Sequence, residues 1–174
     1  MTHKNNIQFS HNFCESRLNN NNPPEIFNAY SSLIISLVPL FYGLPKNDIF
    51  YNVAIMFFFT GFSSFYYHYT LNFTGKQADE IPMILSTYYG IWAILKIYLQ
   101  NNMNKVNKYN AANNLYMLLF IIVNTIKNLD FYFPFLFTSY IFSLLFLINK
   151  VSKKYNIPYK KNLFISLFGA ICWL

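Results

Sequence analysis

The sequence predicts an all-α fold, a polytopic bundle of transmembrane helices. Apolar residues make up 55% of the chain and charged residues 11%, whereas soluble domains carry about 25% charged residues. The apolar residues gather into runs close to the ~20 residues with which a helix crosses a bilayer core. The net charge is +7, but the lysines fall mostly between these runs, which favours a membrane environment and no nucleic-acid partner.

The chain divides into a polar N-terminal tail, residues 1–24, and a transmembrane helical domain, residues 25–174. The tail is rich in asparagine and too polar to fold alone. It lacks the continuous apolar segment of a cleavable signal peptide, so we expect the first span to act as the targeting signal. Pro23 and Pro24 precede Glu25 and predict the start of the first helix, because proline suits the first turn and an acidic group complements the helix dipole there.

Six apolar runs follow the tail, and we expect each to form a helix. They cover residues 26–44, 49–71, 81–99, 111–126, 131–148 and 162–174. Pro82 predicts that the third helix begins at residues 81–82. The polar segments 100–110 and 149–161 predict loops. The sixth run is shorter than a complete span, so the chain is expected to contain about six spans, with the last one incomplete.

The basic residues predict how the bundle is oriented. One side of the membrane holds Lys4, Arg17, Lys76 and Lys127. The other side holds Lys46, Lys96, Lys105, Lys108, Lys150, Lys153, Lys154, Lys160 and Lys161. Cytoplasmic loops carry the excess of lysine and arginine. We therefore expect a luminal or extracellular N-terminus in a multi-pass protein of an endomembrane.

Residues 61–83 contain the candidate site. His68 is the only histidine outside the tail, and Asp79 and Glu80 form the only adjacent acidic pair. Ionisable groups beside membrane spans are costly and indicate a functional site. Ser64 and His68 are four residues apart and share one helix face. A short return loop can bring Asp79 back against the end of the second span, so a hydroxyl, an imidazole and a carboxylate are expected to converge.

These side chains allow more than one interpretation. Neutral imidazole is a good zinc ligand, which makes His68 part of a possible metal site. Alternatively, His68 caps its helix or sits at the headgroup level among neighbouring tyrosines. A nucleophilic hydrolase built from Ser64, His68 and Asp79 is disfavoured, because a Ser-His pair at i,i+4 on one helix aims the hydroxyl poorly at the ring and no nucleophile-elbow sequence is present.

Several motifs in register resemble the alkaline ceramidases. They are Phe13-Cys14-Glu15, Glu25-Ile26-Phe27-Asn28, Ser31-Ser32-Leu33, the pair Ser64 and His68, the flanking Tyr69-Thr70-Leu71, and Asp79-Glu80-Ile81-Pro82-Met83. The match in order and spacing covers roughly the first 100 residues. These ceramidases belong to a wider superfamily of seven-span membrane hydrolases that includes the adiponectin-receptor-type proteins. The resemblance therefore implies a seven-span family fold.

The resemblance also implies a reaction, the zinc-dependent hydrolysis of the amide bond of ceramide to sphingosine and a fatty acid. It implies that His68 is a zinc ligand and that Asp79 positions or deprotonates the attacking water. Ser64 is implied as a donor to the developing oxyanion. The expected partner is a membrane lipid, ceramide or a related sphingolipid.

Two hypotheses about activity stay open. The family's other two zinc histidines lie on the seventh span as H-x-x-x-H, and this chain ends before such a span. His3 and His11 lie in the tail without that spacing. Either the chain is an alkaline-ceramidase-like amidase that lacks its last zinc ligands, or it is a non-catalytic relative that binds sphingolipid.

The resemblance further implies a calcium site at the tail. The matching positions are Asn12, Phe13 (through its carbonyl), Glu15 and Glu25. Asn12 stands where the family has an aspartate, and Arg17 where it has an asparagine. Calcium affinity follows the number of carboxylate ligands, so these replacements weaken the prediction. The alternative is that Glu25 caps the first helix and Glu15 is solvated.

Overall fold

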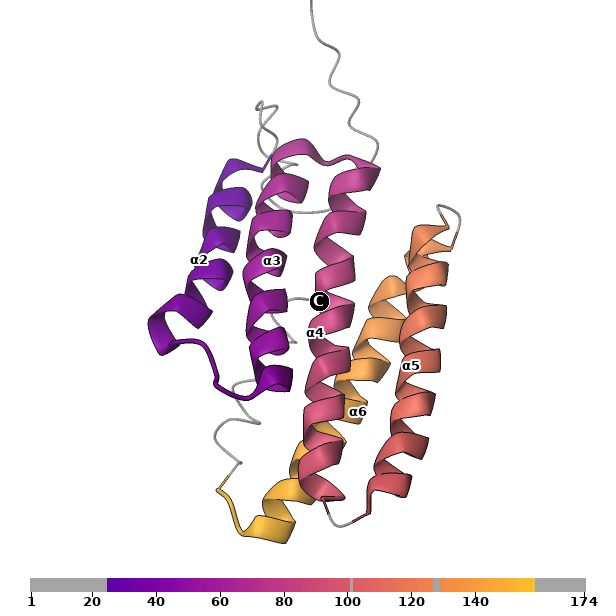
Figure 1. Ribbon diagram of the computed structural model, residues 1–174. Helices are drawn as coiled ribbons and strands as arrows, with labels where there is room; N and C mark the ends of the chain where they lie inside the picture. The colour runs from indigo at the N-terminus through magenta and orange to yellow at the C-terminus, as the bar shows by residue number, and fades with distance from the viewer. Residues whose placement is uncertain (1–24, 101, 127–128, 159–174) are drawn as a thin grey trace, which may run out of the picture.

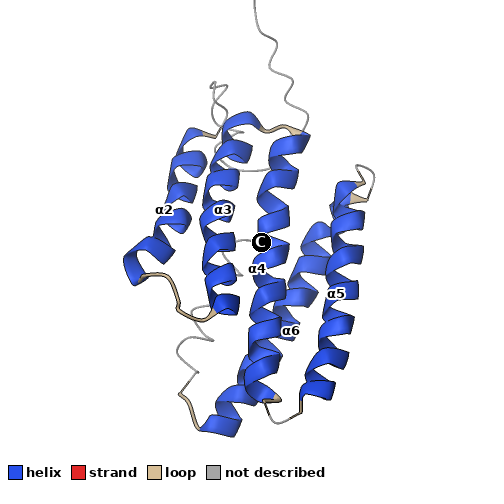
Figure 2. Cartoon of the chain, viewed as in Figure 1, coloured by secondary structure: helices blue, strands red, loops and turns tan. Residues whose placement is uncertain are grey.

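The computed structural model describes residues 25–100, 102–126 and 129–158. Helices make up all the regular structure in these residues, and Figure 2 shows no strand among them. The prediction of an all-α helical bundle is therefore confirmed. The tail, residues 1–24, and the sixth apolar run, residues 162–174, lie outside the described residues.

The helices run alternately up and down through the bundle (Figure 1). In chain order they are α2 (Ile26–Tyr42), α3 (Asp48–Thr70), α4 (Phe73–Tyr98), α5 (Met103–Thr125), the 3-10 turn η1 (Asp130–Tyr132) and α6 (Phe133–Tyr155). Helix α3 packs between α2 and α4, while α4 also packs against α5 and α6. This alternation places the start of α2, the end of α3 and the start of α4 at one end of the bundle, which we name the site end.

Three helices of the described part are long and apolar enough to cross a membrane, namely α3, α4 and α6. Helix α2 is apolar but shorter. Helix α5 does not meet the same criterion, since its first turns carry lysine and asparagine. The protein is thus a helical membrane protein in its described part.

The predicted helix ends were wrong in three places. Helix α4 begins at Phe73 instead of residue 81, because the side chain of Asn72 caps it by accepting a hydrogen bond from the Gly75 N–H (2.6 Å). Pro82 consequently lies inside α4, where it lacks the N–H that a helix interior normally uses. Asp79 therefore belongs to the helix and not to a loop at its start.

The other two corrections concern segments predicted as loops. Helix α5 begins at Met103, since Asn102 accepts a hydrogen bond from the Lys105 N–H (3.0 Å) and supplies an N-cap within the polar segment. Helix α6 continues to Tyr155, beyond the end of the apolar run at residue 148. Long lysine side chains can continue a helix past the membrane core because their stems are apolar and their ammonium groups reach water.

The two halves of the bundle pack by different means. Between α4, α5 and α6 lies a core of large side chains: Ile84, Ile91, Leu95, Phe120, Phe133 and Tyr140. Between α2 and α3 the backbones approach closely where Ser32 and Ser36 lie against Gly61, and Tyr30 meets Phe65 edge to face beside them. Small residues allow helix backbones to approach closely, which is a common basis of helix packing in membranes.

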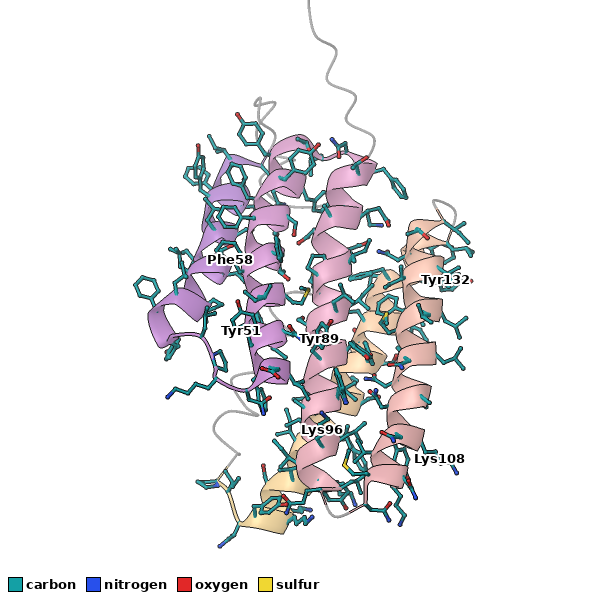
Figure 3. The ribbon with its side chains drawn as sticks, viewed as in Figure 1. Tyr51, Phe58, Tyr89, Lys96, Lys108 and Tyr132 are labelled. Carbon is teal, nitrogen blue, oxygen red and sulfur yellow. The ribbon has the colours of Figure 1, made fainter. Side chains whose placement is uncertain are left out.

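The lysines are distributed unequally between the two ends. Those at the end opposite the site end are Lys46, Lys96, Lys105, Lys108, Lys150, Lys153 and Lys154, and we name this the lysine end. Figure 3 labels two of them, Lys96 and Lys108, near the corresponding ends of α4 and α5. Lys76, on the first turns of α4, lies at the site end. This distribution fits the positive-inside pattern, while the orientation itself stays a prediction.

Candidate functional site

A tight connection between α3 and α4 builds the site end. Helix α3 ends at Leu71, which adopts the left-handed conformation (φ 45°) and donates its N–H to the Tyr67 carbonyl (2.7 Å). Asn72 then caps α4 directly. With so short a turn, the last turn of α3 and the first turns of α4 lie side by side, so side chains from both helices can share one site.

His68 is held by a carboxylate from a distant part of the chain. Its Nδ1 atom lies 2.5 Å from Oε2 of Glu25, a residue 43 positions earlier. The Glu25 side chain is fully buried, and the His68 side chain is 15% exposed. Because an ionised carboxylate only accepts hydrogen bonds, Nδ1 is the donor in this contact. The contact thus fixes the ring orientation of His68.

Ser64 and Asp79 complete the same cluster. The Ser64 hydroxyl hydrogen-bonds to the Asp79 carboxylate, and His68 is near enough to interact electrostatically with that carboxylate. Ser64 is buried. The Oδ1 atom of Asp79 is also buried and has no hydrogen-bond partner among the described residues. A buried carboxylate oxygen of this kind is an acceptor available to a water or a substrate N–H or O–H group.

Close packing of α2 against α3 brings the Glu25 side chain into contact with His68. The Ser36 hydroxyl donates to the Phe58 carbonyl (2.8 Å), and a Cβ atom added at Gly61 would collide with the backbone and side chain of Ser36. The Glu25 carboxylate also accepts a hydrogen bond from the Asn28 side chain (3.4 Å). The absence of a side chain at Gly61 therefore sets the spacing at which the Glu25–His68 contact forms.

The structure brings Ser64, His68 and Asp79 together, as the spacing predicted. Glu25 occupies the N-cap position of α2, but its carboxylate makes no capping hydrogen bond and turns toward His68 instead. The remaining residues of the predicted calcium site, Asn12, Phe13 and Glu15, lie outside the described residues, as do His3 and His11.

The described residues alone do not fit a zinc site. In residues 25–100, 102–126 and 129–158, no three His, Cys, Asp or Glu side chains are grouped so that they could hold one metal ion. Catalytic zinc usually has three protein ligands. His68 can supply at most one imidazole ligand, and the nearby carboxylates are engaged with His68 and Ser64.

Sequence reasoning missed the contact between Glu25 and His68. Both residues were selected, but Glu25 was assigned to calcium and His68 to zinc. The available signal was topological: Glu25 directly precedes α2 and His68 lies in the last turn of α3, and consecutive antiparallel helices bring these two ends together. This order of helix ends could have indicated that Glu25 and His68 are neighbours.

Comparisons with known proteins agree on one family. The family model described as Ceramidase matches residues 6–174. Alkaline ceramidase 1 of Mus musculus is 31% identical over 90 residues, which cover 46% of this chain and 33% of the mouse protein. The match thus spans about a third of that relative's length. No solved structure matches the chain.

Proposed function

Because the chain belongs to the ceramidase family, we propose that it acts as a membrane hydrolase on the amide bond of ceramide or a related sphingolipid. The observation that carries this proposal is the cluster of Ser64, His68 and Asp79 at the site end. The Glu25 carboxylate contacts His68 and orients its ring. The cluster lies between helices that suit a membrane, where a lipid substrate is dissolved.

The proposed reaction uses the buried carboxylate as a proton acceptor. Water adds to the acyl carbon of the amide and gives up a proton to Asp79. The C–N bond then breaks, the amine leaves as sphingosine after accepting that proton, and the acyl group leaves as a fatty acid. The Ser64 hydroxyl orients the carboxylate, and once Asp79 has taken the proton this hydroxyl can turn to donate to the substrate oxygen, where negative charge develops.

Metal dependence forms a separate part of the proposal. The family resemblance implies Zn²⁺ at His68. A zinc ion held there would polarise the amide carbonyl and lower the pKa of a bound water. The resemblance likewise implies Ca²⁺ at Glu25 together with Asn12, Phe13 and Glu15. Measuring zinc and calcium in the purified full chain tests both ideas, and His68→Ala should lower the zinc content alone.

A second candidate function is sphingolipid binding without hydrolysis. It is favoured by the lack of a three-ligand metal cluster in the described helices. Under this proposal the buried Oδ1 of Asp79 receives a hydroxyl or amide N–H of the lipid, and no bond breaks. The chain would be a membrane protein that retains the family's bundle and its lipid recognition.

Ceramide hydrolysis by membranes that contain the full chain separates the two candidates. We expect sphingosine release by the unaltered chain, and its loss in Asp79→Asn, which keeps the shape of the side chain but removes its basicity. Lys153→Gln, at the lysine end, serves as the control and should leave the rate unchanged. Ceramide binding without sphingosine release, with or without added zinc, would favour the non-catalytic candidate.

A further inference from the structure

The lysine end carries a concentration of charge that hydrolysis at the site end does not use. Among the described residues, Asp48 is the one acidic side chain that accompanies the lysines there. Ceramide is uncharged, so these lysines do not match the proposed substrate. Basic residues at a membrane face attract the negative headgroups of anionic lipids, which makes a second lipid a reasonable partner for this end.

The last two turns of α6 hold their lysines against aromatic rings. Lys150 and Lys154 are spaced i,i+4, which places both on one side of the helix. The Lys150 Nζ atom lies 5.2 Å from the centre of the Phe146 ring, and the Lys154 Nζ atom lies 5.4 Å and 5.2 Å from the rings of Tyr98 and Tyr155. These contacts restrain the ammonium groups and keep positive charge on one side of α6.

Lys154 also joins α6 to α4. Its Nζ atom donates to the Tyr98 carbonyl (2.7 Å), and the Tyr155 hydroxyl donates to the Ile97 carbonyl (3.1 Å). These carbonyls belong to the last turn of α4, where helical partners are lacking. An ammonium group has three donors, so Lys154 retains donors for an anion after making this bond.

An apolar groove of about 520 Å³ opens beside this junction. Its walls include Ile94 and Ile97 of α4, Val151 and Tyr155 of α6, and Ile157 just beyond α6. Lys154 does not line the groove, but it is the neighbour in sequence of Tyr155 and bonds to the neighbour of Ile97, two residues that do. A ligand that satisfies both the groove and this lysine has an apolar chain and a negatively charged head.

We propose that this groove binds one anionic glycerophospholipid of the surrounding membrane. One acyl chain lies along Ile97 and Val151, and the phosphate lies against Lys154 with Lys150 one turn away. The site is separate from the Ser64–His68–Asp79 cluster, because it lies at the opposite end of α4. The protein thus carries a second lipid site that selects for charge, independently of what happens at the site end.

Retention of phospholipid by the purified full chain tests the proposal. The chain is taken from vesicles of phosphatidylcholine mixed with phosphatidylglycerol into mild detergent, and bound lipids are counted by native mass spectrometry. We expect phosphatidylglycerol to be retained preferentially, and Lys150→Gln with Lys154→Gln to weaken that retention about tenfold. The hydrogen bond from the Tyr155 hydroxyl to the Ile97 carbonyl remains in this variant, so the junction between the helices is kept.

Two further variants make the test specific. Lys105→Gln with Lys108→Gln removes the same charge from the same end, on α5 and away from the end of α6 (Figure 3), and should change retention less than about twofold. Ile157→Trp fills the groove from an exposed position and should reduce retention with every lysine intact.

Several results would overturn the proposal. If the Lys150/Lys154 and Lys105/Lys108 double variants lose phosphatidylglycerol retention equally, the lysine end attracts anionic lipid only through its overall charge. Equal retention of both phospholipids would mean that the groove accepts any acyl chain. Absence of retained lipid, or an Ile157→Trp variant that retains as much as the unaltered chain, would mean that the groove is filled by the protein itself.

Discussion

Removal of the Glu25 carboxylate offers the sharpest test of how the site is assembled. Glu25→Ala leaves the Nδ1–H group of His68 without its acceptor. Leaving a buried donor unsatisfied costs about 1–3 kcal/mol, and this hydrogen bond is charge-assisted and short, at 2.5 Å. The converse change, His68→Ala, removes one partner of a fully buried carboxylate, which costs about 1–3 kcal/mol.

The two single variants and the double variant together give the coupling energy. If the contact is formed as described, the double variant should be less destabilised than the sum of the single variants, by about 1–3 kcal/mol. In a chain of this size, 1 kcal/mol shifts the melting temperature by about 2–4 °C. The non-additive part of the shift should therefore be several degrees, measured by thermal unfolding of the full chain in mild detergent.

A matched control uses an acidic residue at the opposite end of α3, the helix that carries His68. Asp48 begins α3 and is exposed, and it lies about 30 Å along the helix from His68. Asp48→Ala combined with His68→Ala should be additive within about 0.5 kcal/mol. If the Glu25 cycle is also additive within that limit, the contact does not stabilise the site, and the assignment of Glu25 as the residue that orients His68 is wrong.

The remaining predictions concern packing and metal dependence. Gly61→Ala should destabilise the chain by about 1–3 kcal/mol, since the added methyl group collides with Ser36 of α2; an unchanged melting temperature would contradict the close α2–α3 contact. Tyr140→Phe should cost about 1 kcal/mol, because it removes the buried hydrogen bond from the Tyr140 hydroxyl to Asn113 (2.5 Å); denaturant titration in detergent measures this, with Tyr155→Phe at the surface as the comparison. Treatment with a metal chelator tests zinc dependence directly: if the hydrolysis needs zinc, chelation abolishes it and added zinc restores it, whereas activity that survives chelation would argue against zinc dependence.

The sequence determined the fold class because the membrane imposes a simple requirement. Every backbone polar group in a bilayer core must be bonded internally, so long apolar runs become helices. The same logic identified His68 and Asp79, since ionisable groups beside such runs are rare. Helical spacing alone placed Ser64 and His68 on one face, and the structure agrees.

Helix ends were set by local contacts that hydropathy does not record. Asn72 and Asn102 look like ordinary loop residues in an asparagine-rich chain, yet each caps a helix that begins well before its apolar run. At the end of α6, Lys154 and Tyr155 extend the helix by bonding to carbonyls of α4. Apolar length therefore predicted the membrane-spanning part of each helix and not its polar extensions.

Only the tertiary structure decided what the chemical groups of the site do to one another. Glu25 and His68 are far apart in sequence, and their contact depends on α2 approaching α3 closely enough at Gly61. The direction in which Asp79 points likewise follows from the turn of α4 on which it lies, which Asn72 sets by capping that helix. Residue types and their helical spacing are properties of one segment, whereas a hydrogen bond between two helices depends on the distance that their packing allows.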